Sequence, residues 1–200
     1  MRDKIENICG SERSVEIEFI CEKLSGLSNM KILDVGGIPT SEAFNAPIKE
    51  IIKNSNITYD VCDFRGGKYR GDFVTIKISE TYDAVMFLSS LEHFPQCTEG
   101  DLVFREGEDR KGYLKALSIL KEKGKIILTV PFGKLRWQPY HQNYNLDGIK
   151  KLTEGSKIIE SYTYRLIEDS HWVLTDPELM EDVLYTDKAH GVGCFLLEKL

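Results

Sequence analysis

The 200-residue chain holds 26 lysine and arginine residues against 32 aspartate and glutamate residues, which gives a formal net charge of -6 at pH 7. An acidic chain lacks the broad basic face that binding along a phosphate backbone requires, so we expect no nucleic-acid partner. Hydrophobic residues make up 42% of the chain, enough for the core of one large domain over residues 1–200.

The five cysteines are scattered and form no Cys-x-x-Cys pair. They are typical of reduced thiols rather than of a disulfide framework or a zinc site, so we expect a cytoplasmic protein. The first four residues precede no apolar signal core, and no apolar run is long enough to span a bilayer, so no membrane partner is expected. Neither a His-Glu-x-x-His motif nor a histidine cluster indicates a metal site.

Alternating helices and strands are predicted along the chain. Residues 14–24 have apolar side chains at helical spacing, and an apolar strand at 31–35 follows. The remaining helices are expected at 41–53, 113–122 and 146–152, and the remaining strands at 57–62, 73–76, 82–88, 125–130, 158–166, 171–174 and 193–197. This alternation predicts an α/β fold with a doubly wound, mostly parallel sheet and helices on both faces.

Two connections carry signals of their own. Residues 95–111 are polar and heavily charged, which favours a loop or a lid over a neighbouring site. Lys123 and Gly124 follow the third predicted helix, and a glycine commonly ends a helix.

The most informative stretch is Lys-Ile-Leu-Asp-Val-Gly-Gly at 31–37. Gly36 and Gly37 let the backbone bend sharply and let a ligand lie against bare main chain. A doubly wound sheet opens its cofactor crevice at such a turn. Asp34, inside the strand, suggests that a carboxylate is needed there to accept hydrogen bonds from turn amides or from a ligand's ammonium group. A Gly-Gly turn alone is equally compatible with a plain loop.

Polar residues also follow two later strands. Asp63 ends the strand at 57–62, and Ser89 to His93 follow the strand at 82–88. A carboxylate at the place of Asp63 can accept both hydroxyls of a ribose. The alternative is a solvated aspartate at a strand end.

Several segments together resemble the ordered motifs of class I S-adenosylmethionine-dependent methyltransferases, over about residues 11–200. They are Leu33–Gly37, Asp63, Asp72, Tyr82–Val85, Leu91–His93 and Leu120–Lys125. The resemblance is greatest to small-molecule members found among bacterial and archaeal polysaccharide and glycosyl-transfer genes. It implies a Rossmann-like methyltransferase fold with an antiparallel last strand, S-adenosylmethionine as cofactor and a small-molecule substrate.

The resemblance also implies roles for individual residues. Asp34 and Gly36, with Gly37 beside them, match the residues under the methionine part of the cofactor, and Asp63 matches the ribose acid. The remaining expected contacts are Asp72 and Phe73 with the adenine, and Ser89 and Leu91 near the sulfonium.

The glycine turn departs from the Gly-x-Gly-x-Gly pattern of that family. Ile38 and Thr40 hold the last two glycine places, with Pro39 between them. A β-branched side chain does not readily take positive φ, so the turn must follow another path, with Ile38 placed to crowd the methionine carboxylate. A second interpretation therefore stays open: a catalytically silent cofactor-binding or regulatory relative.

Methyl transfer from a sulfonium is an in-line displacement, so alignment of the acceptor carries much of the acceleration. A hydroxyl acceptor also needs a base. The catalytic candidates are His93 and Glu92, just past the strand at 82–88, and His141 in the aromatic, amide-rich segment 136–144. The alternative for Glu92 and His93 is a pair that merely fixes the loop. The alternative for His141 is an aromatic segment that packs on the sheet. The sequence thus predicts methyl transfer to a small polar acceptor, such as a saccharide hydroxyl.

Overall fold

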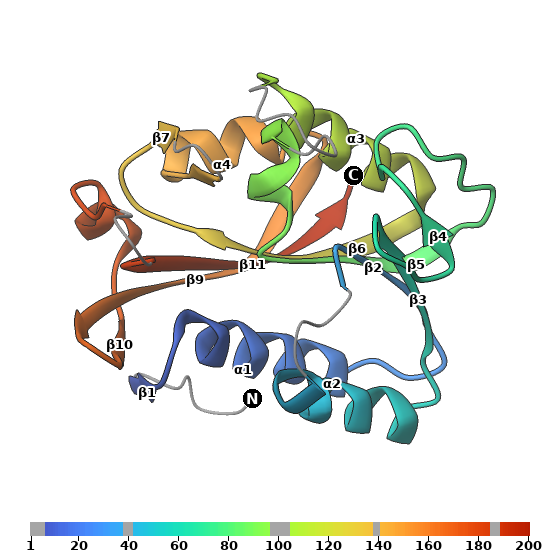
Figure 1. Cartoon of the computed structure of the whole chain (residues 1–200), viewed down its shortest axis with the longest axis horizontal. Coiled ribbons are helices and arrows are strands. Elements are labelled where there is room, and N and C mark those ends of the chain that lie inside the picture. The colour runs from blue at the N-terminus through green and yellow to red at the C-terminus, as the bar shows by residue number, and fades with distance from the viewer. Residues whose placement is uncertain (1–6, 38–41, 97–104, 138–140, 185–188) are drawn as a thin grey trace.

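The computed structural model describes residues 7–37, 42–96, 105–137, 141–184 and 189–200, in which one nine-stranded sheet carries helices on both faces (Figure 1). The strands of this sheet are β1 (Asn7–Cys9), β2 (Lys31–Val35), β3 (Thr58–Asp63), β4 (Tyr69–Arg70), β5 (Tyr82–Leu88), β6 (Leu120–Pro131), β9 (Ser156–Glu168), β10 (His171–Leu174) and β11 (Gly191–Lys199). A separate hairpin pairs β7 (Arg136–Trp137) with β8 (Gln142–Asn143). The helices are α1 (Glu12–Ser25), α2 (Glu42–Asn54), α3 (Glu108–Ile119) and α4 (Leu146–Leu152), with short 3-10 helices η1 (Leu91–Gln96) and η2 (Pro177–Met180).

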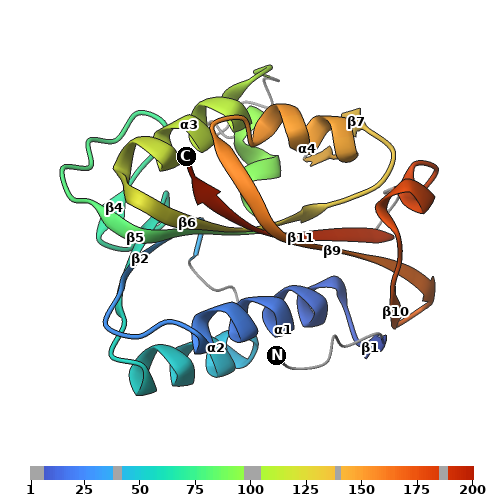
Figure 2. The same cartoon turned by 180° about the vertical axis from the view of Figure 1, so that it is seen from behind.

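The strand order is β1-β10-β9-β11-β6-β5-β2-β3-β4. The pairs of β2 with β3 and β5, of β3 with β4 and of β5 with β6 are parallel. The last strand, β11, is antiparallel to both β6 and β9, and β10 and β1 continue the antiparallel half. In both Figure 1 and Figure 2, α1 and α2 cover one face, and α3 and α4 cover the other. The predicted doubly wound sheet with an antiparallel last strand is confirmed.

The alternation of side chains along β2 divides the core into two layers. Ile32 packs with the apolar side of α1, including Phe19, whereas Leu33 packs with Tyr113 of α3. Ile32, Leu33 and Tyr113 are fully buried. Because successive side chains in a strand point to opposite faces, Asp34 shares the face of Ile32 and lies under α1 and α2.

The third predicted helix is displaced. We expected it at 113–122, but α3 spans Glu108–Ile119, and β6 starts at Leu120. Asp109, in the charged stretch that suggested a loop, is buried and accepts a hydrogen bond from the Tyr144 hydroxyl at 2.8 Å. Lys123 has a φ of 57° because β6 shifts its register against β5 at this point. Lys123 and Gly124 therefore mark an irregularity in a strand, and the predicted glycine cap is wrong.

Two other predictions change. The segment 73–76 contains no strand; the Asp72 carbonyl accepts from the amides of Thr75 (3.2 Å) and Ile76 (2.8 Å), which closes a turn. The edge strand β4 lies between the predicted strands at 57–62 and 73–76, where no strand was expected. Of the predicted lid at 95–111, residues 97–104 lie outside the described residues, and 108–111 form the first turn of α3.

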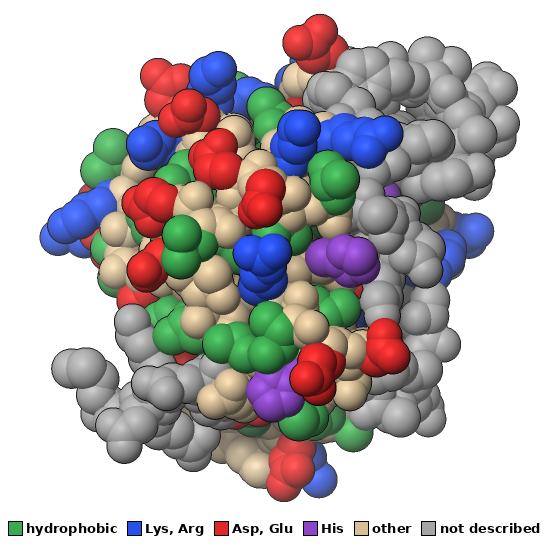
Figure 3. All heavy atoms as spheres, turned by 90° about the vertical axis from the view of Figure 1, so that its left-hand side faces the viewer, with side chains coloured by type: hydrophobic (Ala, Val, Ile, Leu, Met, Phe, Trp, Pro, Cys, Tyr) green, Lys and Arg blue, Asp and Glu red, His purple; other side chains and the backbone are tan. Residues whose placement is uncertain are grey.

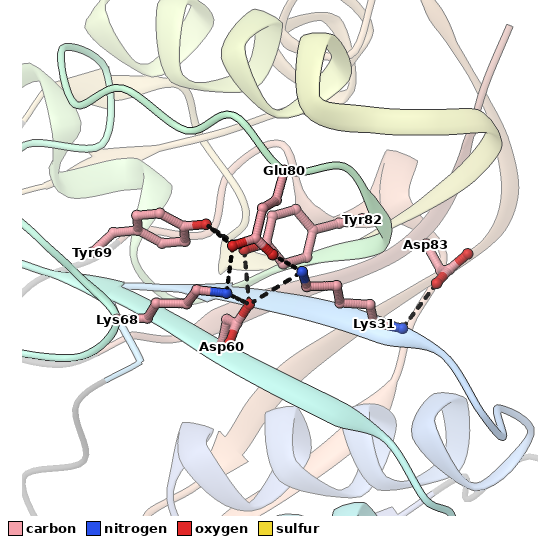
Figure 4. A network of polar contacts seen from close by, with 7 residues as sticks. All are labelled: Lys31, Asp60, Lys68, Tyr69, Glu80, Tyr82 and Asp83. Carbon is pink, nitrogen blue, oxygen red and sulfur yellow. Dashed lines mark hydrogen bonds and ion pairs between the residues drawn. The ribbon is translucent and has the colours of Figure 1, made fainter.

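A polar network joins the starts of β2 and β5 to β3 (Figure 4). The ammonium group of Lys31 contacts Glu80 and lies 3.9 Å from Asp60. Lys68 lies 2.8 Å from Asp60 and 2.7 Å from Glu80. The Tyr82 hydroxyl donates to Asp60 at 2.9 Å. Two ammonium groups thus balance two carboxylates, which links three strands of the parallel half.

One face of the surface, the described helices and the grouping of possible metal ligands bear on other types of site. On the face in Figure 3, basic and acidic side chains are interspersed with apolar ones rather than gathered by sign. Among the described helices, none combines the length and apolar character needed to cross a membrane. Within the same residues, no three His, Cys, Asp or Glu side chains are grouped so as to hold a metal ion.

Candidate active site

The carboxyl ends of β2, β3 and β5 open into one cleft with a volume of about 910 Å³. Most of the residues singled out from the sequence line it, although they come from four separate segments. They are Asp34, Gly36, Gly37, Asp63, Asp72, Phe73, Ser89 and His93. The structure therefore brings together the three strand-end features on which the prediction depended.

Both turn glycines are sterically required. Gly36 has a φ of 83°, and a Cβ there would lie 2.6 Å from the Cβ of Ser90. A Cβ on Gly37 would lie 1.9 Å from Oδ2 of Asp34. The turn after β2 is thus pressed against the turn after β5, and the Ser90 hydroxyl donates to the Val35 carbonyl at 2.6 Å. Main chain forms this part of the cleft wall, as a closely bound ligand needs.

Asp34 is buried, and its two oxygens differ. Oδ2 accepts a hydrogen bond from the Tyr59 hydroxyl, whereas Oδ1 has no partner among the described residues. Burial raises the pKa of Asp34 to about 7, opposed by the Tyr59 hydrogen bond and reinforced by the charge of Asp63. A ligand ammonium group beside this carboxylate would replace the missing partner and favour the ionised form.

Asp63 is held by an arginine that the sequence analysis did not single out. The main-chain N and Nε of Arg65 donate to Oδ1 of Asp63 at 2.7 and 3.1 Å. Nη2 of Arg65 donates to Oδ2 at 3.2 Å. Asp63 is therefore a buried carboxylate with both oxygens bound by the Arg65 guanidinium, rather than a solvated aspartate at a strand end.

Asp72 and Phe73 form the wall next to Asp63. Oδ1 of Asp72 accepts from the main-chain N of Val74 at 2.9 Å, which fixes the turn. Phe73 packs edge-on against Phe87 and Phe94, with ring centroids 5.9 and 6.1 Å away. An apolar ring beside a carboxylate is suited to a flat, nitrogen-rich ligand group.

The turn after β5 is strained and tightly held. Ser89 has a φ of 41°, in the left-handed region that non-glycine residues rarely adopt. Its main-chain N donates to the hydroxyl and the carbonyl of Thr129 at 3.0 and 3.2 Å. Its hydroxyl donates to Oε1 of Glu16. Leu91 is fully buried beneath this turn, so the structure places it in the core and not along the cleft.

The three catalytic candidates occupy different depths. His93 lines the cleft, and its side chain is 44% exposed. Glu92 is buried behind it, with Oε1 3.8 Å from Nε2 of His93, and burial raises the pKa of Glu92 to about 7. The buried ring of His141 meets the His93 ring edge-on at 6.3 Å, and burial lowers the pKa of His141 to about 4. Of these three, His93 is the side chain that reaches the cleft.

The amide-rich segment after β6 is mostly used for packing. Residues 138–140 lie outside the described residues. Gln142 and Asn143 are buried in the β7–β8 hairpin, and Asn143 donates to the Lys134 carbonyl at 2.8 Å. Tyr144 is also buried, so the described part of this segment agrees with the alternative interpretation, an aromatic segment that is packed and not a ligand site.

The first helix supplies a buried carboxylate that the sequence analysis missed. Oε1 of Glu16 accepts from Ser89 and from the Thr129 hydroxyl, the latter at 2.9 Å. Oε2 lies 3.1 Å from Nη1 of Arg13, which lines the cleft. Glu16 precedes Phe19 and Ile20 by three and four positions, so helical spacing places it within the buried stripe of α1. That spacing was the available signal.

This fold and site can be compared with known proteins. No protein-family model matches the sequence, and no curated protein sequence matches it. Among solved structures, the N-methyltransferase NodS from Bradyrhizobium japonicum WM9, in complex with S-adenosyl-L-homocysteine, superposes with a TM-score of 0.58 at 12% identity, over 94% of this chain and 87% of NodS. A S-adenosylmethionine-dependent methyltransferase from Clostridium acetobutylicum ATCC 824 gives 0.53 at 13% identity, over 92% of this chain and 90% of that one.

The chain has the fold of the S-adenosylmethionine-dependent methyltransferases. The [4+2]-cyclase SpnF also superposes, with a TM-score of 0.54 at 13% identity, over 98% of this chain and 87% of SpnF. A methyltransferase fold alone therefore does not fix the reaction, and the function must be argued from the site.

Proposed function

We propose that this protein transfers a methyl group from S-adenosylmethionine to a small polar acceptor. The observation that carries the proposal is the convergence of the turn glycines, Asp34 and Asp63 on one cleft at the strand ends of a methyltransferase fold. In open α/β sheets, ligands bind outside the carboxyl ends of the strands. A carboxylate-lined crevice also suits a ligand with an ammonium and a sulfonium group.

The described residues fit this cofactor. Oδ1 of Asp34 is a buried oxygen without a partner among the described residues, and a ligand ammonium can satisfy it. Gly36 and Gly37 leave main chain where side chains would block a ligand. We assign the methionine part to these three residues, the ribose to Asp63, and the adenine to Asp72 and Phe73.

When bound, S-adenosylmethionine supplies an activated methyl group. The chain's own residues then align the acceptor and remove its proton. His93 accepts that proton at its ring, and the buried Glu92 carboxylate, 3.8 Å from Nε2, stabilises the imidazolium that forms. The turn from Ser89 to His93 is fixed by Thr129 and Glu16, so the base stays in place.

A saccharide hydroxyl remains our preferred acceptor, because a cleft-facing base is needed for a hydroxyl group. An amine is the competing acceptor, since NodS is described as an N-methyltransferase. A neutral amine is already nucleophilic, so a reaction independent of His93 would favour it.

A second candidate function is a catalytically silent cofactor-binding or regulatory relative. The observation that favours it is the occupation of both Asp63 oxygens by Arg65, together with the altered glycine turn at Ile38. A protein of this kind would keep the fold without turnover, and SpnF illustrates that the fold accommodates other chemistry.

Binding of S-adenosylhomocysteine separates these functions from a protein with no cofactor site. Calorimetry and thermal unfolding are measured with the wild-type chain and with Asp34→Asn, which keeps the shape of the side chain. A ligand at 100 times its Kd adds about 2.7 kcal/mol to the free energy of unfolding. Absence of both heat and stabilisation at millimolar ligand would reject the cofactor assignment.

Turnover is then tested with radiolabelled S-adenosylmethionine and a panel of saccharides and amines. Transfer of label to an acceptor supports the methyltransferase. Cofactor binding without transfer to any member of a broad panel favours the silent relative.

A further inference from the structure

The sequence after β2 departs from a glycine-rich turn. Pro39 has no amide hydrogen to donate, and the β-branched residues Ile38 and Thr40 occupy places where glycine is usual. A cationic side chain of another element can supply a carboxylate with the donor that the proline lacks. This inference rests on the proposed function, since it concerns the methionine carboxylate of the cofactor.

We propose that Arg13 of α1 binds the methionine carboxylate of the cofactor, and that Glu16 is the positioning residue for Arg13. Arg13 lines the cleft, and Nη1 lies 3.1 Å from Oε2 of Glu16. Glu16 is itself anchored through Oε1 to Ser89 and Thr129. The guanidinium is thus tied to the turn after β5, beside the expected sulfonium position.

Other cations line the same cleft, but they come from other elements, and one of them, Arg105, belongs to the segment just before α3. Arg65 is engaged by Asp63 at the ribose end. Lys49 and Lys53 come from the second half of α2. Arg13 is joined through Glu16 to Ser89, the residue assigned near the sulfonium, which places its guanidinium toward the methionine end of the cleft. Its charge also opposes the rise in the pKa of Asp34 that burial causes.

The surroundings of Arg13 match an amino-acid group rather than a simple anion. Glu16 contacts the Arg13 guanidinium directly, and the charge of Arg13 opposes the raised pKa of the buried Asp34 and Glu92. Asp34 and Glu92 each have an oxygen without a partner among the described residues. An anion alone would meet repulsion there. A zwitterion places its ammonium group on Asp34 and its carboxylate on Arg13, so both charges are matched.

The pairing with Glu16 explains how Arg13 keeps one direction. A buried carboxylate is costly unless it is paired and hydrogen-bonded. Oε1 of Glu16 accepts from Ser89 and Thr129, whereas Oε2, which has no hydrogen-bond partner among the described residues, is balanced by the ion pair with Arg13. Glu16 engages one nitrogen, Nη1, of a group with five donors. The side chain of Arg13 is 34% exposed, so a ligand can reach it.

The test compares two ligands that differ in the amino-acid part. S-adenosylhomocysteine carries the carboxylate and ammonium groups, whereas 5′-methylthioadenosine lacks both. For Arg13→Ala, we expect about a 10- to 100-fold loss of affinity for S-adenosylhomocysteine, as for loss of a charge-assisted hydrogen bond, and an unchanged affinity for 5′-methylthioadenosine. Glu16→Gln should show the same selectivity with a smaller loss, because Arg13 is kept but no longer oriented.

Arg13→Lys is the second variant, because an ammonium group preserves the charge beside Glu16 and so protects the fold. It should lose affinity for S-adenosylhomocysteine alone, since a single ammonium cannot form the planar fork. Lys150→Ala is the control, which removes an exposed cation of α4 that does not line the cleft and should leave both affinities within about twofold, a change of ~0.4 kcal/mol.

Three results would overturn the assignment. Wild-type affinity for S-adenosylhomocysteine in both Arg13 variants would show that another group binds the carboxylate. An equal loss for both ligands would show a general structural role. A wild-type chain that binds neither ligand would reject the cofactor site itself, and with it this inference, which is distinct from failure of Arg13 alone.

Discussion

Arg65 holds both carboxylate oxygens of Asp63, through its main-chain N and Nε to Oδ1 and through Nη2 to Oδ2. The carboxylate assigned to the ribose therefore has an internal partner before any ligand arrives. The Arg65 side chain is 56% exposed, so solvent competes for the guanidinium. A ribose must either displace the two side-chain contacts or share Asp63 with them.

Removing the side chain of Arg65 should strengthen cofactor binding. For Arg65→Ala, we expect the affinity for S-adenosylhomocysteine to rise about 2- to 5-fold, because an exposed ion pair contributes about 0.2–1 kcal/mol. The main-chain N at position 65 would still hold Oδ1. Calorimetry measures the effect, and a loss of affinity would instead make Arg65 part of the ligand site.

Asp63→Ala is the companion variant. It should weaken S-adenosylhomocysteine binding by about 1.5–3 kcal/mol if the carboxylate accepts ribose hydroxyls. Unchanged affinity would mean that Asp63 serves only to hold the loop through Arg65.

The parts of the site that follow strands could be predicted from the sequence. Asp34, Gly36 and Ser89 were expected at the sheet edge because apolar runs locate strands, and the ends of parallel strands meet at one edge. The structure places all three along one cleft. The local sequence pattern was sufficient there because each strand and the turn that follows it are adjacent in the chain.

The missed residues act through long-range contacts. Glu16 meets Ser89 and Thr129, which lie 73 and 113 positions away, and no local pattern encodes such a pairing. A glutamate in an amphipathic helix usually faces solvent. The start of α3 was missed for a related reason: Asp109 looks like a loop charge until its partner Tyr144 is known.

Proton release on ligand binding should report on Asp34. Burial raises its pKa to about 7, so the carboxyl is partly protonated at neutral pH. A ligand ammonium group lowers that pKa, and binding at pH 7 should release up to about half a proton. Calorimetry of S-adenosylhomocysteine binding in buffers with different ionisation enthalpies measures the number of protons released.

Asp34→Asn is the control, because it has the same shape and no titratable proton. The heat of S-adenosylhomocysteine binding to this variant should not depend on the ionisation enthalpy of the buffer. Proton uptake by the wild-type chain would be contrary to an ammonium group beside Asp34.

Glu92 should make the protein less stable as pH rises. Burial raises its folded pKa to about 7, above the usual 4.5, so the folded chain retains a proton that the unfolded chain releases. The contribution of Glu92 to the free energy of unfolding is therefore fully present below pH 4.5, falls between about pH 4.5 and 7, and is lost above pH 7.

Glu92→Gln mimics the protonated form and should remove that part of the decline. Between pH 5 and pH 8, we expect the free energy of unfolding of the variant to exceed that of the wild type by on the order of 1–3 kcal/mol, as measured by urea unfolding. Glu122→Gln removes one exposed negative charge and serves as the control. Parallel curves for the wild type and Glu92→Gln would show that Glu92 ionises normally.

His93 should affect turnover far more than cofactor binding. It faces the cleft, whereas His141 is buried behind it, with a pKa lowered to about 4 by burial. Once an acceptor is known, His93→Ala should lower kcat by about 10²–10⁴-fold, as loss of a general base does, and leave the affinity for S-adenosylhomocysteine nearly unchanged. His141→Ala should mainly lower stability, because it removes a packed ring next to His93. Initial rates and calorimetry on both variants separate the two roles. Full turnover in His93→Ala with loss in His141→Ala would move the base to position 141, and full turnover in both would show that alignment alone carries the reaction.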